Sequence, residues 1–371
     1  MIRRPSYHSV YTLSIKTSEK LRDKVRTHCA VSMRNHWGSL LLLVLLGSFF
    51  VFPEAVLARE MWGGAGFLVA SPLERAYVKL PFASEGNRDL FAIGKEDEKG
   101  AIDKLCSLLV KEFKRYGWHE DPCLHVQWQT ELKTNLGHPL IYAVFGEGPD
   151  TTLILGGVHP DELNPVHLAF RFARFLLKNP NEYQGKGFRV VVAPLVNPDG
   201  FFKTRPSRTN QGRVDLNRNF LTLDWYAKAL DSWLKQRRAD PRYFPGFFPN
   251  TEIETIFQTG LVEKFSPSKI LSLHAPLGFY DYDGPGDQKL HVVTTLETKA
   301  RDFAKKVAEK SRNYRIADHF FYPGSLGNYA GNERHIPTLT LELQTTNPEM
   351  VNNYWDQFLP GFVQSIQYSL R

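Results

Sequence analysis

The sequence predicts an α/β fold with a mixed, largely parallel central sheet flanked by helices. Short apolar strands rich in β-branched residues alternate along the chain with longer segments whose apolar residues recur at helical spacing. These strands are apolar on both faces, as strands are when helices cover both sides of a sheet. No internal repeat or low-complexity segment occurs in the sequence, so the alternation indicates a layered α/β domain rather than a repeat protein.

The elements follow in a regular order. Apolar residues at helical spacing predict a helix over 97–116. Two apolar strands, 139–146 and 151–158, are separated by a Gly-Pro-Asp turn and predict a β-hairpin. After them, helices and strands alternate. We expect helices at 163–178, 222–238, 251–265 and 295–312, and strands at 188–196, 269–275 and 337–343.

The first 58 residues have the pattern of a secretory leader. A basic segment, residues 1–36, precedes an uncharged apolar run at 37–52, and Val56-Leu57-Ala58 offers the small residues that signal peptidases accept. The apolar run is shorter than the roughly 20 residues that cross a bilayer, so a cleaved signal is favoured over a retained anchor or a cytoplasmic core helix. Met33 is an alternative start site. We therefore expect a periplasmic or secreted protein.

The net charge of +7 is concentrated in that leader. Residues 1–36 carry eight basic and two acidic residues, so the rest of the chain is nearly neutral. We therefore predict neither a nucleic-acid partner nor a stable membrane partner beyond the signal segment. The three cysteines include no CxxC pair, which argues against a cysteine-built zinc site. Cys106 and Cys123 are free to pair in an oxidising compartment, but their spacing does not decide it.

Polar side chains follow four of the apolar strands at their carboxyl ends. The strand at 151–158 leads into His159-Pro-Asp-Glu162, and the strand at 188–196 leads into Asn197-Pro-Asp-Gly200. The later strands end at His274 and carry Glu342. Ligands of open α/β sheets bind beyond the carboxyl ends of the strands. The sequence therefore predicts a functional site at this edge of the sheet.

Two histidines and one carboxylate with an open fourth position form a catalytic zinc site. His159 and Glu162 lie three residues apart in a tight loop, and His274 completes the set. Each residue alone has a simpler explanation: a histidine after a strand is most often a hydrogen-bonded loop residue, and a glutamate before a helix is favoured by the helix dipole. Together they predict one zinc ion per chain. The pattern is neither HExxH nor HxxEH, because Leu163 follows Glu162.

The order of these motifs resembles the zinc metallocarboxypeptidase superfamily, over about residues 100–371. The motifs that carry the resemblance are His159-Pro-Asp-Glu162, the segments at 197–200 and 208–220, Leu273-His-Ala275 and Leu341-Glu-Leu343. The resemblance implies a carboxypeptidase A-like fold. Together with the leader at 1–58, this divides the chain into the leader, an N-terminal extension at 59–96 and a zinc carboxypeptidase catalytic domain at 97–371.

The resemblance implies a role for each matching residue. His159, Glu162 and His274 would bind the metal, and Glu342 would be the general base. Arg208 would polarise the scissile carbonyl. Asn217 and Arg218 would clasp the terminal carboxylate of the substrate, for which a planar guanidinium is suited. The family's mobile tyrosine corresponds to either Tyr322 or Tyr329.

Within the superfamily, the chain is most similar to bacterial murein tripeptide amidases and DL-carboxypeptidases. The compact spacing between Asn197-Pro-Asp-Gly200 and the Asn-Arg pair, and the segment 324–342, carry this similarity. It implies hydrolysis of the bond between γ-D-glutamate and meso-diaminopimelate in peptidoglycan stem peptides. The alternatives are an L-specific carboxypeptidase, an N-acyl amino-acid deacylase, and a cell-wall binding module without catalysis.

Other conspicuous residues are expected to be structural. Trp225, Trp233 and Phe257 lie on predicted helices and are expected in the core. His167 follows the metal loop on a helix and is expected to be packed or solvated rather than a fourth ligand. Residues 280–283 are open to two interpretations, a cleft wall or a plain loop.

Overall fold

The computed structural model describes residues 91–286, 294–318 and 320–370. The leader at 1–58, its apolar run at 37–52, Met33 and nearly all of the extension at 59–96 lie outside the described residues. The described residues all belong to one compact unit. In this part of the chain, none of the helices combines the length and the apolar character needed to cross a bilayer.

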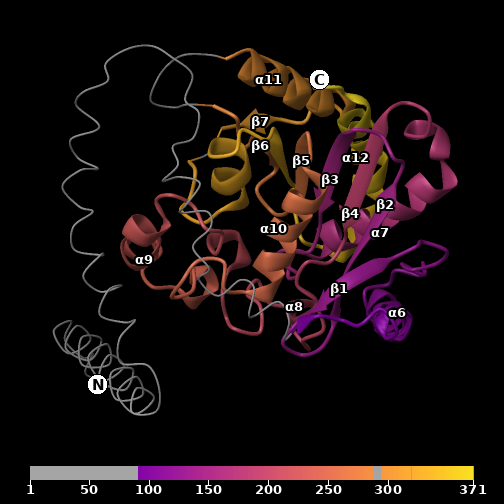
Figure 1. Cartoon of the computed structure of the whole chain (residues 1–371), viewed down its shortest axis with the longest axis horizontal. Coiled ribbons are helices and arrows are strands. Elements are labelled where there is room, and N and C mark those ends of the chain that lie inside the picture. The colour runs from indigo at the N-terminus through magenta and orange to yellow at the C-terminus, as the bar shows by residue number, and fades with distance from the viewer. Residues whose placement is uncertain (1–90, 287–293, 319, 371) are drawn as a thin grey trace, which may run out of the picture. The chain divides into compact units, whose positions relative to one another are not determined.

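The strands of the described residues form one eight-stranded sheet with the order β1-β2-β4-β3-β5-β8-β6-β7 (Figure 1). The four central strands β4, β3, β5 and β8 run parallel, and β2 and β6 flank them in antiparallel orientation. The predicted mixed, largely parallel sheet is therefore confirmed. The strands are β1 (Gln129–Lys133), β2 (Pro139–Phe145), β3 (Asp150–Leu155), β4 (Phe188–Ala193), β5 (Lys269–His274), β6 (Phe279–Tyr282), β7 (Ile316–Ala317) and β8 (Thr338–Glu342).

The predicted hairpin between β2 and β3 is wrong. Strand β4 lies between them, antiparallel to β2 and parallel to β3. A short turn between two apolar strands does not require that they pair, because the sheet can receive a third strand between them. Most of the segment 280–283 is not a plain loop but belongs to β6. This strand pairs with β8 and buries Tyr280 and Tyr282.

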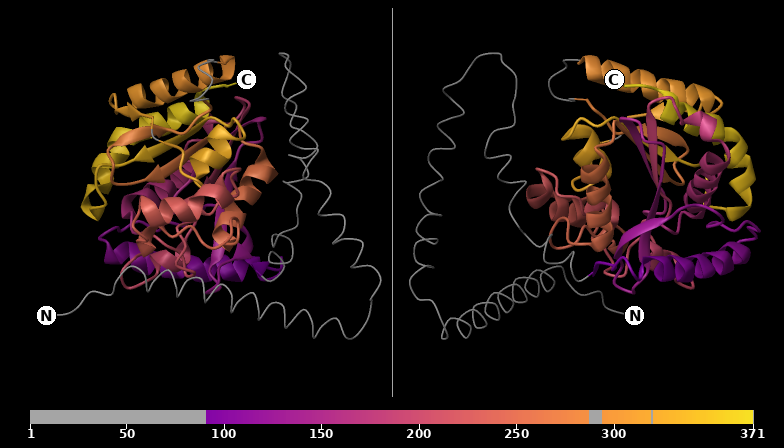
Figure 2. Two further views of the ribbon diagram at one scale, coloured as in Figure 1. Left: turned by 90° about the vertical axis from the view of Figure 1, so that its left-hand side faces the viewer. Right: turned by 45° about the vertical axis from the view of Figure 1, so that its right-hand side comes forward.

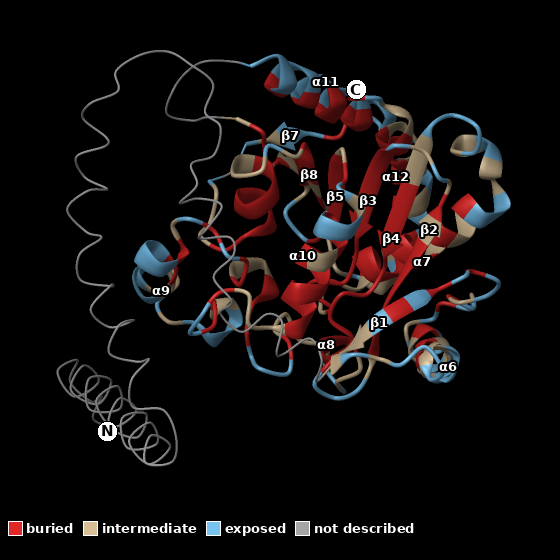
Figure 3. Ribbon diagram, viewed as in Figure 1, coloured by how far each residue is buried: buried red, intermediate tan, exposed pale blue. Residues whose placement is uncertain are grey.

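Two hydrophobic cores cover the two faces of the sheet, as the alternation of side chains along a strand requires. On β5, Leu271 and Leu273 belong to the core beneath α7, α11 and α12, whereas Ile270 belongs to the core beneath α10. Figure 2 shows α11 and α12 stacked on one side of the sheet and α10 on the other. The central strands β2, β4, β3, β5 and β8 are largely buried, as Figure 3 shows, whereas the edge strands β1 and β7 are partly exposed. Both faces of the central strands are therefore closed to water.

The predicted helices are present: the one at 163–178 has the predicted bounds, and the others have shifted ends. Thr294 begins α11 with a capping interaction, because its hydroxyl accepts the Glu297 N–H at 3.0 Å. Helix α12 was not among the predicted elements, because Pro360 interrupts its pattern. The longer helices are α6 (Glu98–Arg115), α7 (Leu163–Lys178), α9 (Trp225–Lys235), α10 (Ile253–Phe265), α11 (Thr295–Lys310) and α12 (Val351–Gln367), and a single turn forms α8 (Pro198–Phe201). Short helical turns lie at Pro180–Glu182, Leu216–Arg218, Pro241–Tyr243, Gly327–Asn332 and Pro348–Met350.

A disulfide joins Cys106 of α6 to Cys123, 17 residues further along the chain. The question that the spacing left open is thus settled in favour of pairing. The bond holds the loop after α6 against its own helix. Disulfides persist mainly in oxidising compartments.

Candidate metal centre and active site

A tight turn after β3 brings His159 and Glu162 together. Gly157 has φ +61°, and a Cβ on Gly156 would lie 2.7 Å from the Cβ of Ala169, so both positions need glycine. The Glu162 N–H then donates to the His159 carbonyl at 3.0 Å. Glu162 is the residue that precedes α7, but its side chain makes no capping hydrogen bond. Its carboxylate therefore does not cap the N-terminus of α7.

The three predicted ligands converge on one point. Nδ1 of His159 lies 3.1 Å from Oε1 of Glu162 and 3.0 Å from Nδ1 of His274, and Oε2 of Glu162 lies 3.0 Å from that same His274 nitrogen. All three residues are buried. Burial alone would raise the pKa of Glu162, but the adjacent His159 and His274 outweigh it and lower that pKa.

The outer nitrogens of both imidazoles are already engaged. Nε2 of His159 lies 3.0 Å from Oδ1 of Asp215, and Nε2 of His274 lies 3.1 Å from Oγ of Ser272. A carboxylate only accepts, so His159 carries its proton on Nε2 and turns the lone pair of Nδ1 inward. This arrangement of carboxylate, histidine and metal position is typical of zinc sites. Sequence reasoning missed Asp215, although it lies in the same VDLNRNF segment as Asn217 and Arg218.

These contacts fit a divalent metal ion. Two imidazole nitrogens and a carboxylate face one another at 3.0–3.1 Å, where their lone pairs would repel without a cation between them. Two nitrogens and one carboxylate match the donor set of a catalytic zinc site that keeps its fourth position open. In the described part of the chain, this is the one group of histidine, cysteine and acidic side chains with metal-binding spacing.

Glu342 lies beside this cluster on the neighbouring strand. It is the register partner of His274 in the parallel pair β5–β8, and its Oε2 accepts the Leu277 N–H at 3.4 Å. Burial raises its pKa to about 7, and the charge of Glu162 adds to that effect while His274 opposes it. A carboxyl group with such a pKa is suited to exchanging protons near neutral pH.

Arg208 connects the ligand Glu162 to Asp215. Its Nε donates to Oδ2 of Asp215 at 2.9 Å, and its Nη1 donates to Oε1 of Glu162 at 3.2 Å. Burial would lower the pKa of Arg208, but these two carboxylates raise it, so the guanidinium stays charged. The opposite charge holds the pKa of Asp215 far below its usual range despite burial.

The Asn217-Arg218 pair lies in the turn that follows Asp215. Oδ1 of Asn217 accepts the Leu326 N–H at 2.8 Å, which fixes the amide and leaves its Nδ2 to donate elsewhere. The Arg218 guanidinium lies over the ring of Tyr322, with 4.3 Å from Cζ to the ring centroid. The structure thus places Arg218 and Tyr322 side by side, although 104 residues of sequence separate them.

Residues 134–366 match the protein family described as zinc carboxypeptidase. This range contains every predicted site residue and more than half of the chain. The chain belongs to the zinc carboxypeptidase family. Its members use zinc, and the His159, Glu162 and His274 cluster is the site that can bind it.

Two curated relatives of this zinc carboxypeptidase are named murein peptide amidase A. The protein of Vibrio campbellii is 28% identical over 233 residues, which is 61% of this chain and 84% of the relative. The protein of Escherichia coli K12 is 30% identical over 145 residues, which is 38% of this chain and 56% of the relative. Bovine thrombin-activatable fibrinolysis inhibitor, solved in complex with a tick carboxypeptidase inhibitor, shares the fold with a TM-score of 0.55 at 15% identity, covering 71% of this chain and 95% of its own.

The structure also shows where the two candidate tyrosines and the residues expected to be structural lie in this carboxypeptidase. Tyr329, the alternative to Tyr322, is buried in the core beside Phe220, with the Arg334 guanidinium 3.5 Å from its ring centroid. Tyr322 is therefore the better candidate for the mobile tyrosine. His167 packs between the rings of Phe113 and Trp118, and burial lowers its pKa to about 3, which agrees with a packed residue and not a ligand. The predicted core residues Trp225 and Phe257 are buried, and Trp233 is partly buried.

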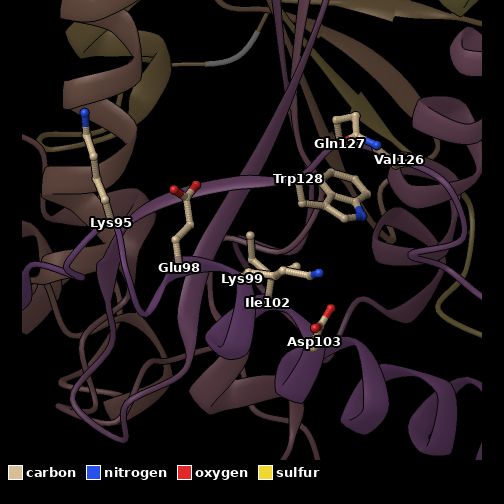
Figure 4. A pocket seen from close by; sticks show the side chains of 8 residues that line it. All are labelled: Lys95, Glu98, Lys99, Ile102, Asp103, Val126, Gln127 and Trp128. Carbon is tan, nitrogen blue, oxygen red and sulfur yellow. The ribbon is translucent and has the colours of Figure 1, made fainter.

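An open hollow of about 430 Å³ lies between the start of α6 and the segment that leads into β1 (Figure 4). It contains none of the metal ligands and none of the other predicted site residues, so it is separate from the carboxypeptidase site. Its lining residues are Lys95, Glu98, Lys99, Ile102, Asp103, Val126, Gln127 and Trp128.

Proposed function

We propose that this zinc carboxypeptidase trims peptidoglycan stem peptides and hydrolyses the γ-D-glutamyl–meso-diaminopimelate bond of the tripeptide L-Ala-γ-D-Glu-meso-diaminopimelate. The similarity to relatives named murein peptide amidase A carries the choice of substrate. The convergence of His159, Glu162 and His274 beside Glu342 supports the hydrolytic chemistry.

The substrate is held at its free carboxyl end. The guanidinium of Arg218 binds the terminal carboxylate, and the oriented Nδ2 of Asn217 donates a second hydrogen bond to it. Tyr322 covers the Arg218 guanidinium and shields that contact from water. A carboxylate anchored at this position sets which peptide bond lies next to the metal ligands, so the enzyme removes one residue from the end.

Proton transfer falls to Glu342. Bound zinc would supply a Lewis acid that polarises the scissile carbonyl and acidifies a water molecule. Glu342 takes a proton from the attacking water as oxygen adds to the carbonyl carbon, and gives it to the nitrogen as the carbon–nitrogen bond breaks. Within the described residues no contact uses Nη2 of Arg208, so this group remains to stabilise the charge that develops on the carbonyl oxygen.

We further propose that the protein works in the periplasm or outside the cell, delivered by the N-terminal signal. The leader composition and the Cys106–Cys123 disulfide both support an oxidising compartment. Cell fractionation and sequencing of the mature N-terminus test this. A mature chain that begins after Ala58 is expected, whereas a chain that retains 37–52 in the membrane fraction would mean an anchor.

The substrate proposal is tested with purified, zinc-loaded protein and four substrates. These are the tripeptide L-Ala-γ-D-Glu-meso-diaminopimelate, the corresponding tetrapeptide, an all-L peptide of equal length and an N-acyl amino acid. Mass spectrometry should show release of diaminopimelate from the tripeptide, and Glu342→Gln should abolish that release. The matched control is Glu349→Gln, which removes an exposed carboxylate seven residues after Glu342 and should leave turnover unchanged.

The alternatives give different products in the same experiment. Turnover of the all-L peptide with no cleavage of the tripeptide would mean an L-specific carboxypeptidase. Turnover of the acyl amino acid alone would mean a deacylase. Full zinc content with no hydrolysis of any substrate would mean a binding module, and each of these results contradicts the proposal.

A further inference from the structure

The end of α9 brings a third arginine, Arg237, to the carboxylate-binding side of the site. Its guanidinium carbon lies 5.1 Å from the ring centroid of Tyr322 and 4.7 Å from that of Tyr243. Arg218 lies 4.3 Å from the same Tyr322 ring. Both arginines line one small hollow, which Tyr243 and Tyr322 also line. Two guanidinium groups therefore share one aromatic ring and one hollow.

The local backbone holds Arg237 in this place at some energetic cost. The helix ends at Lys235, and the two residues after Arg237, Arg238 and Ala239, have φ +53° and +55°. A left-handed conformation is strained for residues that are not glycine. The turn is closed by Trp233, whose indole N–H donates to the Asp240 carbonyl at 2.7 Å. Strain of this kind is retained where the surrounding structure needs the side chain in one position.

Among the described residues, only one of the three arginines of the site is paired with carboxylates. Arg208 is paired with Glu162 and Asp215. By contrast, no carboxylate in the described residues lies within 4.0 Å of the side-chain nitrogens of Arg218 or Arg237. Burial lowers the pKa of Arg218, and the positive charges of Arg208 and Arg237 lower it further, while Asp215 opposes them. Two neighbouring cations without a counter-ion favour a ligand that carries more than one negative charge.

We propose that Arg237 is a specificity-determining residue that binds a second carboxylate on the C-terminal residue of the substrate, while Arg218 binds the first. The planar, forked guanidinium suits a carboxylate at each position. The preferred substrates are then peptides whose last residue carries two carboxylates. The inference rests on the proposed function, because meso-diaminopimelate is such a residue, and it names the group on the protein that recognises it.

The test compares two tripeptides that differ only in that second carboxylate, L-Ala-γ-D-Glu-meso-diaminopimelate and L-Ala-γ-D-Glu-L-Lys. The wild-type enzyme should prefer the first. Arg237→Gln should lower kcat/KM for the diaminopimelate peptide by about ten- to a hundredfold, mainly through KM, and should leave the lysine peptide nearly unchanged. Arg237→Lys keeps the charge and should retain part of the preference. The matched control, Arg238→Gln, removes the neighbouring exposed charge and should retain all of it.

Each other outcome has a definite meaning. A wild-type enzyme that cleaves both peptides equally, or an Arg237→Gln enzyme that loses both equally, overturns the inference while the proposed function stands. No cleavage of either peptide overturns the proposed function and the inference with it. A third peptide, with D-isoglutamine in place of D-glutamate, checks the identity of the carboxylate: if the Arg237→Gln defect disappears with this peptide, Arg237 binds the glutamyl carboxylate and the inference is wrong. If Arg237→Gln does not fold, as circular dichroism would show, the Arg237→Lys enzyme decides by its ratio between the two peptides.

Discussion

His274 and Glu342 are register partners on the neighbouring parallel strands β5 and β8. Paired residues of adjacent strands project their side chains to the same face of a sheet. A metal ligand and a carboxyl group with a pKa of about 7 are therefore held side by side by the hydrogen bonds of the sheet. The site does not depend on a flexible loop to bring these two groups together.

Replacing Glu342 by Gln should abolish most of the turnover without loss of zinc. The amide has nearly the same shape but cannot take a proton from water, so kcat should fall by about 10²- to 10⁴-fold. Steady-state kinetics and metal analysis of the same preparation provide the measurement. A variant that retains near wild-type kcat would exclude Glu342 as the base.

Asp215 should control the affinity for zinc. Asp215→Asn removes the charge that accepts the Nε2 proton of His159, so zinc affinity should fall by about 10- to 100-fold. Competition with a chromophoric chelator measures this. Ser272→Ala removes the neutral partner of His274 and provides the comparison, with a smaller loss expected. Equal affinities in wild type and Asp215→Asn would contradict the assignment.

Zinc should stabilise the folded protein. The unfolded chain does not assemble His159, Glu162 and His274, so saturation at 100 times the dissociation constant should add about 2.7 kcal/mol to the free energy of unfolding. Differential scanning calorimetry with and without chelator should show a lower Tm for the metal-free protein. The His274→Ala variant should show the same Tm with and without chelator. A wild-type Tm that does not change with zinc would argue against the site.

Glu254 should make the folded state less stable as the pH rises. This fully buried carboxyl has a pKa raised to about 8 by burial, with the charges of Glu252 and Asp199 adding to it and its hydrogen bond from Asn210 opposing it. Between pH 4.5 and about 8 the unfolded chain releases this proton while the folded protein keeps it. The free energy of unfolding therefore falls across that window.

Glu254→Gln should remove this dependence. Between pH 5 and pH 8, the free energy of unfolding of the variant should rise by on the order of 3 kcal/mol relative to that of wild type. Denaturant titrations at the two pH values measure the change, and Glu349→Gln controls for the altered net charge. A pH dependence that is the same in Glu254→Gln and wild type would show that the carboxyl does not titrate as expected.

The buried pair of Lys269 and Asp150 should be costly to break on one side. Lys269 Nζ lies 2.7 Å from Oδ1 of Asp150, and the lysine side chain is fully buried. Lys269→Met leaves a buried carboxylate uncompensated and should cost about 3–5 kcal/mol of the free energy of unfolding. The double variant Lys269→Met/Asp150→Leu should recover much of it in the same denaturant titrations. A double variant no more stable than the single one would point to a packing effect instead.

Local patterns predicted most of the elements, because helical spacing and apolar strands are read from neighbouring residues. They did not predict the order of strands. The turn between β2 and β3 looks like a hairpin turn, and only the insertion of β4 between them, which is a long-range event, shows otherwise. Likewise α12 escaped notice because Pro360 interrupts its pattern.

The metal ligands could be predicted because the ends of two separate strands, β3 and β5, meet at one edge of the α/β sheet. Asp215 and Arg237 could not be assigned in the same way. The partner of Asp215 is a histidine 56 residues away, and Arg237 reaches Tyr322 from the end of a helix whose direction the sequence does not define. Their contribution depends on tertiary geometry rather than on motif spacing.

The two histidines of the metal cluster are 115 residues apart in the chain, one in the turn after β3 and one at the end of β5, and these strands become neighbours only when the sheet forms. A chain still emerging from its ribosome has two of the three metal-binding residues until residue 274 is free. The metal site is therefore completed only after residue 274 has been synthesised. Zinc occupancy consequently reports whether β3 and β5 have come together, and a fragment that stops short of β5 should bind zinc only weakly.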